Sequence, residues 1–187
     1  MAAPGGSGPI GPFPASVGDD DESRSDYDKL RRRVLWSLPY GLYVLGSRDG
    51  ERRNGMTINW VTQVSFDPKL VGVGVEKTAL THELVVAGGV FSLNTISRED
   101  RAIVRRFTKP VEVDLAAMTL NGFPFHDGAT GAPILDQAPA YVDCAVRQAV
   151  DVGGHTFFIG EVVDAGFQHA EDTEVLRMED TRMSYGG

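Results

Sequence analysis

The 187-residue sequence predicts a mainly β fold with short helices, an antiparallel barrel with the helices set around it. Segments rich in β-branched and aromatic residues outnumber those with helical spacing, and the helical ones are short and irregularly placed. Two long strands, about 141–150 and 155–165, are joined through Gly153-Gly154. A parallel sheet would need a helical crossover after nearly every strand, so we expect antiparallel pairing.

The N-terminal residues 1–24 are expected to form a disordered tail. They hold five glycines, four prolines and the acidic run 19–22, with very few large apolar groups to bury. The folded domain is expected to span residues 25–187. It opens with a helix capped by Ser25 or Asp26, and Leu30, Val34 and Leu35 are spaced to form one buried stripe on it.

Two strands, 42–47 and 56–66, are expected to follow as an antiparallel hairpin, because Arg48-Asp49-Gly50 between them supplies turn chemistry. The second strand alternates with a period of two. Its apolar face carries Met56, Ile58, Trp60, Thr62 and Val64, and its more polar face carries Thr57, Asn59, Val61, Gln63 and Ser65.

The remaining elements are shorter. We expect a strand at 70–75, in which Gly72 and Gly74 leave room for another backbone or a flat ligand. A short helix at 81–87, a strand at 90–95 and a helix opened by a capping box at Ser97 follow. Residues 109–139 are rich in Gly, Pro, Asn and Asp and predict a long loop with a few short elements.

Composition excludes several functions. Eighteen basic against 26 acidic residues give a net charge of −8, which opposes a nucleic-acid partner. The single cysteine, Cys144, forms no internal disulfide and is interpreted as a core residue. The four histidines show no ligand spacing, so no metal is expected. Because a single cysteine gives no sign of an oxidising compartment, a cytoplasmic location is expected. Without a signal peptide or a membrane-length apolar run, the protein is expected to be soluble, with no membrane partner.

The strongest local pattern for chemistry lies at residues 76–84. A strand end is followed by Lys77, two threonines and the start of a helix, and this arrangement gathers free backbone amides and a positive charge around one point. It suits a phosphate. The alternative is that Thr78 or Thr81 caps the helix while Lys77 is solvated.

A second group of polar residues is Thr57, Asn59, Gln63 and Ser65, beside Ser92 and Asn94 of another strand. They suit a ligand with several donors and acceptors, or else the solvated half of a sheet. His155 begins a strand just after two glycines, where its ring is placed either over a cleft or in a structural position. The sequence contains no nucleophile elbow and no spaced carboxylate pair.

Several blocks, taken together, closely resemble the flavin reductase-like family of FMN-binding split barrels, over nearly all of residues 30–165. They are Gly41-Leu42-Tyr43-Val44-Leu45, residues 54–68 (NGMTINWVTQVSFDP), residues 76–84 (EKTALTHEL), Phe91-Ser92-Leu93-Asn94, and residues 155–163 (HTFFIGEVV). The resemblance implies an antiparallel Greek-key split β-barrel and a homodimer with one flavin per subunit. FMN is the expected flavin, FAD is the other possibility, and NAD(P)H is the expected co-substrate.

The same resemblance implies roles for particular residues. Thr57, Ile58, Asn59 and Trp60 would lie along the flavin ring and ribityl chain, and Ser92 and Asn94 would add polar contacts. Lys77, Thr81 and His82 would hold the phosphate, and Tyr185 would close over the flavin. His155 matches a histidine near the nicotinamide and is the catalytic candidate, positioning the hydride donor.

The resemblance implies an NAD(P)H-dependent FMN reductase, but Trp60 departs from the small residue of many short reductases. This departure, with residues 38–43 and 59–64, is nearer to the flavoredoxin-like branch, whose members keep FMN as a bound group. The alternative is therefore an electron-transfer flavoprotein fed by a protein partner. A monooxygenase or redox protein is the expected acceptor, and a split barrel serving another cofactor, such as a deazaflavin or haem, is a third hypothesis.

Overall fold

A computed structural model describes residues 12–181 and residue 183, and it divides the chain into two compact units. One unit comprises residues 1–39 with 182–187, and the other comprises residues 40–181. The second unit therefore begins at Tyr40, fifteen positions after the domain start expected from the sequence. The two units are described separately below.

The described residues of the N-terminal unit form one helix, α1 (Asp21–Leu35), which begins earlier than predicted. The Asp20 carboxylate caps it by accepting a 2.8 Å hydrogen bond from the backbone amide of Ser23. Asp21 and Glu22 occupy the first turn, where negative charge is favourable. The acidic run assigned to the tail thus starts the helix. The rest of that tail, residues 1–11, lies outside the described residues.

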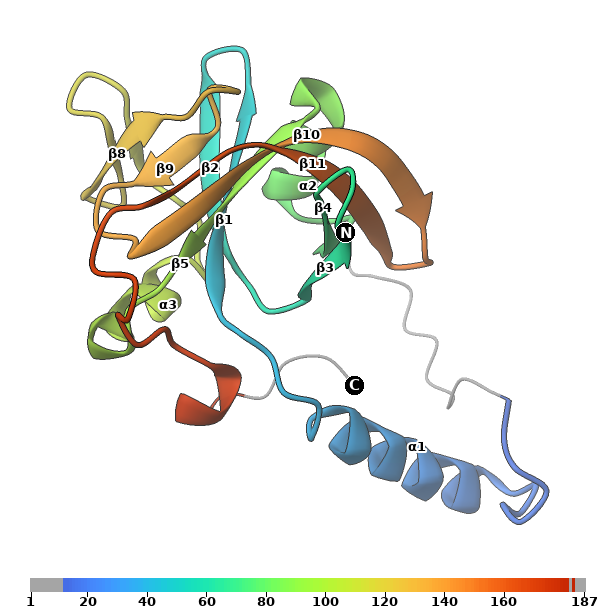
Figure 1. The fold of residues 1–187 in the computed structure, drawn as a ribbon. Helices are drawn as coiled ribbons and strands as arrows, with labels where there is room; N and C mark the ends of the chain where they lie inside the picture. Colours follow the sequence, from blue (N-terminus) through green and yellow to red (C-terminus); the bar gives the residue numbers. More distant parts are fainter. Residues whose placement is uncertain (1–11, 182, 184–187) are drawn as a thin grey trace. The chain divides into compact units, whose positions relative to one another are not determined.

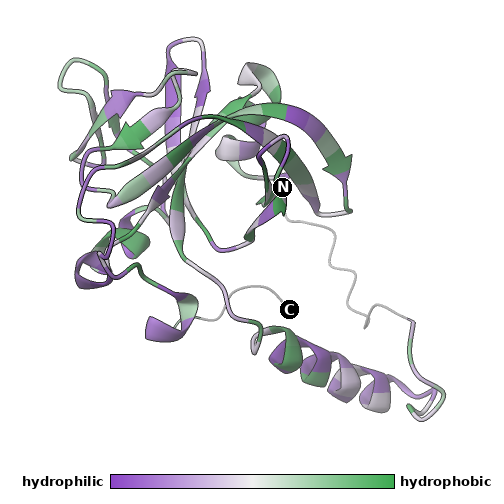
Figure 2. Cartoon of the chain, in the orientation of Figure 1, coloured by the Kyte–Doolittle hydropathy of each residue, from purple (hydrophilic) through white to green (hydrophobic). Residues whose placement is uncertain are grey.

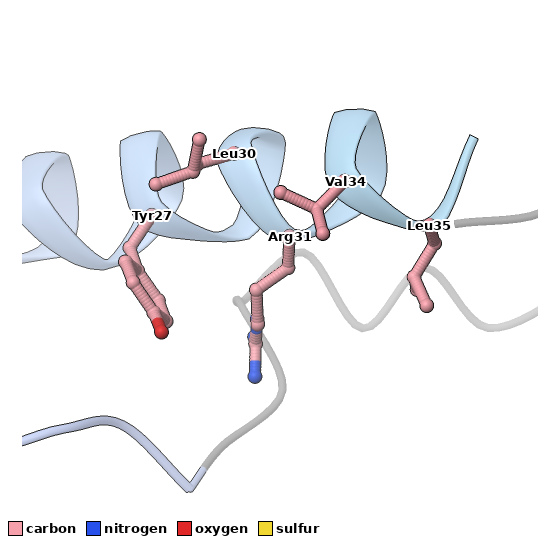
Figure 3. A pocket seen from close by; sticks show the side chains of 5 residues that line it. All are labelled: Tyr27, Leu30, Arg31, Val34 and Leu35. Atoms are coloured by element: carbon pink, nitrogen blue, oxygen red, sulfur yellow. The ribbon is translucent and has the colours of Figure 1, made fainter. Parts of the chain in front are cut away.

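The predicted buried stripe of α1 is exposed in the chain. Leu30, Val34 and Leu35 are 43%, 58% and 47% exposed, and α1 has no buried residue among those described. Figure 3 shows the shallow hollow that they form with Tyr27 and Arg31. Helical spacing correctly predicted the helix, but it does not say which surface its apolar side covers.

Apolar and strongly hydrophilic residues lie next to each other in the C-terminal half of α1 (Figure 2). Phe13 packs edge-on against Tyr27 at 6.2 Å between ring centroids, and the Arg31 guanidinium lies 4.9 Å from the Phe13 ring centroid. The segment before the helix therefore covers a small part of this side through one aromatic residue.

The larger unit is built on a seven-stranded antiparallel sheet with the order β2-β1-β5-β10-β11-β4-β3 (Figure 1). The strands are β1 (Tyr43–Asp49), β2 (Arg52–Ile58), β3 (Val61–Ser65), β4 (Leu70–Glu76), β5 (Val90–Thr95), β10 (Ala140–Asp151) and β11 (His155–Phe167). The predicted strand at 90–95 and the long hairpin across Gly153-Gly154 are confirmed, the hairpin extending by a few residues.

The sheet closes into a barrel because β2 and β3 lie at its opposite edges although only Asn59 and Trp60 separate them in sequence. These two residues form the corner, where the Gly74 amide donates to the Trp60 carbonyl at 3.0 Å. The predicted single strand 56–66 is therefore two strands. Its alternation changes phase at the corner, since Met56, Ile58 and Val61 all pack against the core.

The core fills the barrel interior with residues from β1, β4, β5, β10 and β11, among them Leu45, Phe91 and Phe158. A side chain on Gly160 would place its Cβ 2.6 Å from the Phe91 ring, so only glycine fits there. Cys144 is fully buried, as predicted. Burial, and secondarily the Asp143 carboxylate, raises the pKa of its thiol to about 12, which removes thiolate chemistry near neutral pH.

The shorter elements surround the barrel. They are α2 (Leu80–Gly88), a 3₁₀ turn (Arg98–Asp100) capped by Ser97, α3 (Ala102–Arg106), and a C-terminal 3₁₀ turn (Met178–Asp180). Residues 109–139, expected as a long loop with a few short elements, form a four-stranded sheet. Its strands are β6 (Val113–Asp114), β7 (Thr119–Leu120), β8 (Phe123–Asp127) and β9 (Pro133–Leu135). No helix in the described part of the chain is long and apolar enough to cross a membrane.

Candidate functional site

The end of β4, the first turn of α2 and the start of β11 meet at one place in the barrel unit. Glu76 of β4 pairs with His155 of β11, and the backbone amide of Lys77 donates to the Gly154 carbonyl at 3.0 Å. Lys77, the start of α2 and His155 are thereby held together by backbone pairing, although 74 or more residues separate the two strands in sequence.

The N-terminus of α2 has an uncapped first turn. Its N-cap residue is Ala79, and no side-chain oxygen among the described residues accepts its amides. Neither Thr78 nor Thr81 caps the helix, so that alternative is wrong. The first amides of a helix have no acceptor within the helix and carry a partial positive charge. With Lys77 two residues before the cap, this turn is suited to an anion.

Lys77 is held by a carboxylate and is not simply solvated. Its Nζ lies 2.7 Å from Oδ2 of Asp151 at the tip of the β10–β11 hairpin. The side chains are 36% and 74% exposed, so solvent screens the pair. The hydrogen bond from Lys77 lowers the pKa of Asp151 below its ordinary value. Asp151 therefore stays charged, and an incoming anion would exchange with it.

His82 lies in the first turn of α2, beside the start of β11. Its Nε2 is 2.7 Å from Oγ1 of Thr156, and its ring packs on Phe158 at 5.4 Å between centroids. Burial, and then the charge of Lys77, lowers the pKa of His82 below 6.5. The folded state thus binds this proton less tightly than the unfolded state. The neutral His82 side chain therefore makes its full contribution to stability above the ordinary histidine pKa. This contribution is lost as the pH falls through the lowered pKa of the folded state.

Thr81 is a structural residue in this turn. It is 1% exposed, and its Oγ1 accepts a 2.7 Å hydrogen bond from Nδ2 of Asn54 in β2. This hydrogen bond joins α2 to β2. The Thr81 side chain therefore supports the turn from inside, and the phosphate role expected for Thr81 stays a prediction.

Replacing Thr81 with valine should destabilise the protein by about 1–3 kcal/mol, because the buried Asn54 amide loses its acceptor. The free energy of unfolding from urea titration measures this effect. Thr78→Val is the matched control, since Thr78 is exposed and should tolerate the change. Equal stability of Thr81→Val and the control would contradict a structural role for the Thr81 hydroxyl.

The barrel corner brings Trp60 against His155. The two ring centroids are 4.8 Å apart with planes at 53°, and the indole also lies over Gly74, where a Cβ would be 3.2 Å from Trp60 Cε3. Among the described residues, the buried Nε2 of His155 and the buried Nδ2 of Asn59 have no hydrogen-bond partner. Buried polar atoms are nearly always paired, so these two are candidates for ligand contacts.

Thr57 and Ile58 lie just before the corner. The Thr57 hydroxyl donates to the Val104 carbonyl at 2.9 Å, and Ile58, 5% exposed, belongs to the core. These two residues fix the corner through α3 and the core. Tyr185, expected to close over the site, lies outside the described residues.

Ser92 and Asn94 differ from the expectation that they contact a flavin. Both are buried, at 0% and 1% exposure. The Ser92 hydroxyl donates to the Pro133 carbonyl at 2.5 Å, Asn94 Nδ2 donates to Val44 O at 3.1 Å, and the Leu135 amide donates to Asn94 Oδ1 at 2.8 Å. They attach β9 to β1 and β5. Local sequence patterns do not indicate these contacts, because β9 lies in the segment expected to be mostly loop.

Two residues of the site were not predicted. Asp151 and Thr156 both lie on the β10–β11 hairpin and bind Lys77 and His82, respectively. Their only sequence signal is their place beside Gly153-Gly154. Among the described residues, no three His, Cys, Asp or Glu side chains gather as metal ligands.

Residues 35–186 match the family described as flavin reductase like domain, so the chain belongs to the flavin reductase-like family. The match covers both the split barrel and the site at Lys77. The family assignment and the mainly β, antiparallel split-barrel fold predicted from the sequence are confirmed. The family places the chain among flavin reductase-like oxidoreductases.

Relatives of this chain differ in length. A high molecular weight rubredoxin of Moorella thermoacetica is 33% identical over 135 residues, which cover 71% of this chain and 58% of the rubredoxin. A ferric-chelate reductase (NAD(P)H) of Archaeoglobus fulgidus is 31% identical over 158 residues, covering 82% and 90%. Among solved structures, an NADH:FAD oxidoreductase of Streptomyces globisporus has a TM-score of 0.70 and 29% identity, covering 90% of this chain and 89% of that one.

Proposed function

We propose that this protein is an NAD(P)H-dependent flavin reductase that binds FMN and transfers hydride from the nicotinamide to the flavin. The observation that carries the proposal is the juxtaposition at one end of the barrel. An uncapped helix N-terminus beside Lys77 lies next to His155, whose ring packs on Trp60, the neighbour of Asn59. His155 Nε2 and Asn59 Nδ2 are both buried without a hydrogen-bond partner among the described residues. The phosphate of FMN suits the helix N-terminus and Lys77. The acceptors on its ring and ribityl chain suit the unpaired nitrogens, so the residues fit this group.

In this proposal each residue has a distinct task. Lys77, His82 and the first amides of α2 hold the phosphate. Asn59 donates its unpaired N–H to a ring acceptor, and Trp60 supplies an aromatic surface beside it. Thr57, Ile58 and Thr81 keep the corner and the turn in place, and Ser92 and Asn94 do the same for the β1–β5 wall. When bound, the flavin accepts hydride at N5 from C4 of the nicotinamide.

His155 is proposed to position the hydride donor. Its ring rests on Trp60, which limits its rotation, and Nε2 has no protein partner among the described residues. The carboxamide of a nicotinamide offers both a donor and an acceptor to such a nitrogen. The protein contributes orientation here, and no nucleophile or general-acid pair is needed.

The relatives support the proposal. The NADH:FAD oxidoreductase and the ferric-chelate reductase (NAD(P)H) both carry a nicotinamide nucleotide in their names. An FMN-binding protein of Thermus thermophilus, 29% identical with a TM-score of 0.63, supports FMN as the flavin, with FAD the alternative. Reduced flavin, or its electrons, would pass to a monooxygenase or redox protein.

An anaerobic stopped-flow experiment tests this function. Protein loaded with FMN is mixed with NADH or with NADPH, and the flavin absorbance is followed. Bleaching faster than that of free FMN with the same nucleotide is the expected result, and the faster nucleotide identifies the natural donor. No acceleration with either nucleotide would refute the reductase.

One observation favours a second candidate, an electron-transfer flavoprotein without nicotinamide oxidation. The Trp60 indole packs against the His155 ring, so this face of the ring is already occupied. Similarity to the high molecular weight rubredoxin supports this candidate. Retention of FMN through desalting, with no bleaching by NADH or NADPH, is the outcome that would favour it.

We also propose that the protein is a homodimer. The barrel unit exposes large apolar side chains on β11 and at the β3–β4 turn: Phe66 is 85% exposed, Phe167 61% and Val163 53%. Large apolar side chains left exposed in a folded unit are candidates for an association surface. Light scattering coupled to gel filtration should give about twice the chain mass of 20.2 kDa. A mass equal to one chain at micromolar concentration would exclude the dimer.

A further inference from the structure

Asp151 ends β10 and binds two groups at once. Its Oδ2 accepts from Lys77 Nζ at 2.7 Å, and its Oδ1 accepts from the backbone amide of Gly153 at 2.9 Å. The second bond closes the hairpin tip, where Gly153 has a φ of +90° that favours glycine. One carboxylate therefore shapes the tip and holds the lysine.

The hairpin tip is fastened beside Lys77 by backbone bonds. The Lys77 amide donates to Gly154 O at 3.0 Å, and the Val152 amide donates to His155 O at 3.1 Å. Glu76 and His155 are paired in the sheet immediately below. Even when the Lys77 ammonium leaves Asp151, the carboxylate stays close to the first turn of α2.

We propose that Asp151 competes with the ligand phosphate for Lys77 and thereby keeps the affinity for FMN low, so that the flavin exchanges as a substrate. This inference rests on the proposed function, because it assumes a phosphate at Lys77. Binding costs the Lys77–Asp151 ion pair, and it leaves Asp151 as a negative charge close to a phosphate of the same sign. Both effects weaken binding of phosphorylated flavins and leave riboflavin unaffected.

The test is Asp151→Asn, which removes the charge and keeps an oxygen to accept from Gly153. Dissociation constants for FMN and riboflavin are measured by quenching of flavin fluorescence. FMN should bind about two- to five-fold more tightly to the variant, the range expected when an exposed ion pair is removed. Riboflavin should bind as to the wild type.

The matched control is Glu161→Gln on the same hairpin, where Glu161 pairs with Arg147 at 2.6 Å. It removes the same charge away from Lys77 and should leave FMN affinity unchanged. An equal gain in the control would overturn the competition and indicate a general charge effect. In a Lys77→Ala background the gain from Asp151→Asn should shrink, whereas an undiminished gain would also overturn the proposal.

These measurements separate this inference from the proposed function. If neither the wild type nor Asp151→Asn binds FMN better than riboflavin, the phosphate site itself is wrong. If the wild type prefers FMN and Asp151→Asn binds FMN with unchanged affinity, the phosphate site stands and the role of Asp151 is wrong.

Discussion

Lys77→Ala should weaken FMN binding by about 10- to 100-fold, because a hydrogen bond to a charged group contributes about 1.5–3 kcal/mol. Riboflavin binding should change little, since riboflavin lacks the phosphate. The measurement is a fluorescence titration of both flavins at one ionic strength. The loss should be larger at low salt, where a partly exposed charge pair is least screened.

Lys69→Ala is the control for this prediction. Lys69 is an exposed lysine in the β3–β4 turn, so its removal changes the net charge equally without touching the first turn of α2. Its affinity for FMN should equal that of the wild type. Parallel losses of FMN and riboflavin affinity in Lys77→Ala would mean that Lys77 supports the fold of the site and does not bind phosphate.

His155→Ala should slow flavin reduction by NADH or NADPH by about 10- to 100-fold, since misplacing a reactant by about 1 Å has effects of that size. The substitution removes the unpaired Nε2 and the ring that rests on Trp60. FMN affinity should change much less, because the phosphate contacts lie on Lys77 and α2. Stopped-flow rates at saturating nucleotide, with FMN affinity measured separately, distinguish the two effects.

His126→Ala is the matched histidine control. His126 lies on β8, where its Nδ1 is 2.8 Å from Asp136 and its ring meets the edge of Tyr141. Its loss should leave flavin reduction unchanged. If His155→Ala reduces FMN as fast as the wild type, His155 does not position the donor, and the electron-transfer alternative gains support.

Local patterns predicted the parts of the fold that depend on near neighbours. The β5 strand, the β10–β11 hairpin and the turn at Gly50 follow from β-branched runs and turn residues. The corner at Asn59-Trp60 was missed, because the strand propensity of 56–66 is continuous and closure depends on β3 pairing with β4 across the barrel. The prediction that the apolar stripe of α1 is buried was wrong for a similar reason. Helical spacing shows that one side of a helix is apolar, but it does not show whether another element covers that side.

The candidate site also contains some residues that local sequence predicts and others that depend on contacts between distant segments. Lys77 was predicted from a strand end followed by a helix start, which is local information, whereas the role of His82 came from the family resemblance. Thr81 belongs to the same motif, yet it points to Asn54 on another strand, and no sequence window contains that contact. Asp151 joins Lys77 from 74 residues away, so only the antiparallel pairing of β11 with β4 brings it to the site.

At the barrel corner, the backbone and the side chain of Trp60 have separate roles. Barrel closure there uses the Trp60 carbonyl, which accepts from Gly74, whereas contact with His155 uses the indole. Any residue can supply the carbonyl, but each offers a different surface to His155. A substitution at position 60 should therefore leave the barrel closed, and under the proposed function it would change the surface that His155 and the electron donor meet.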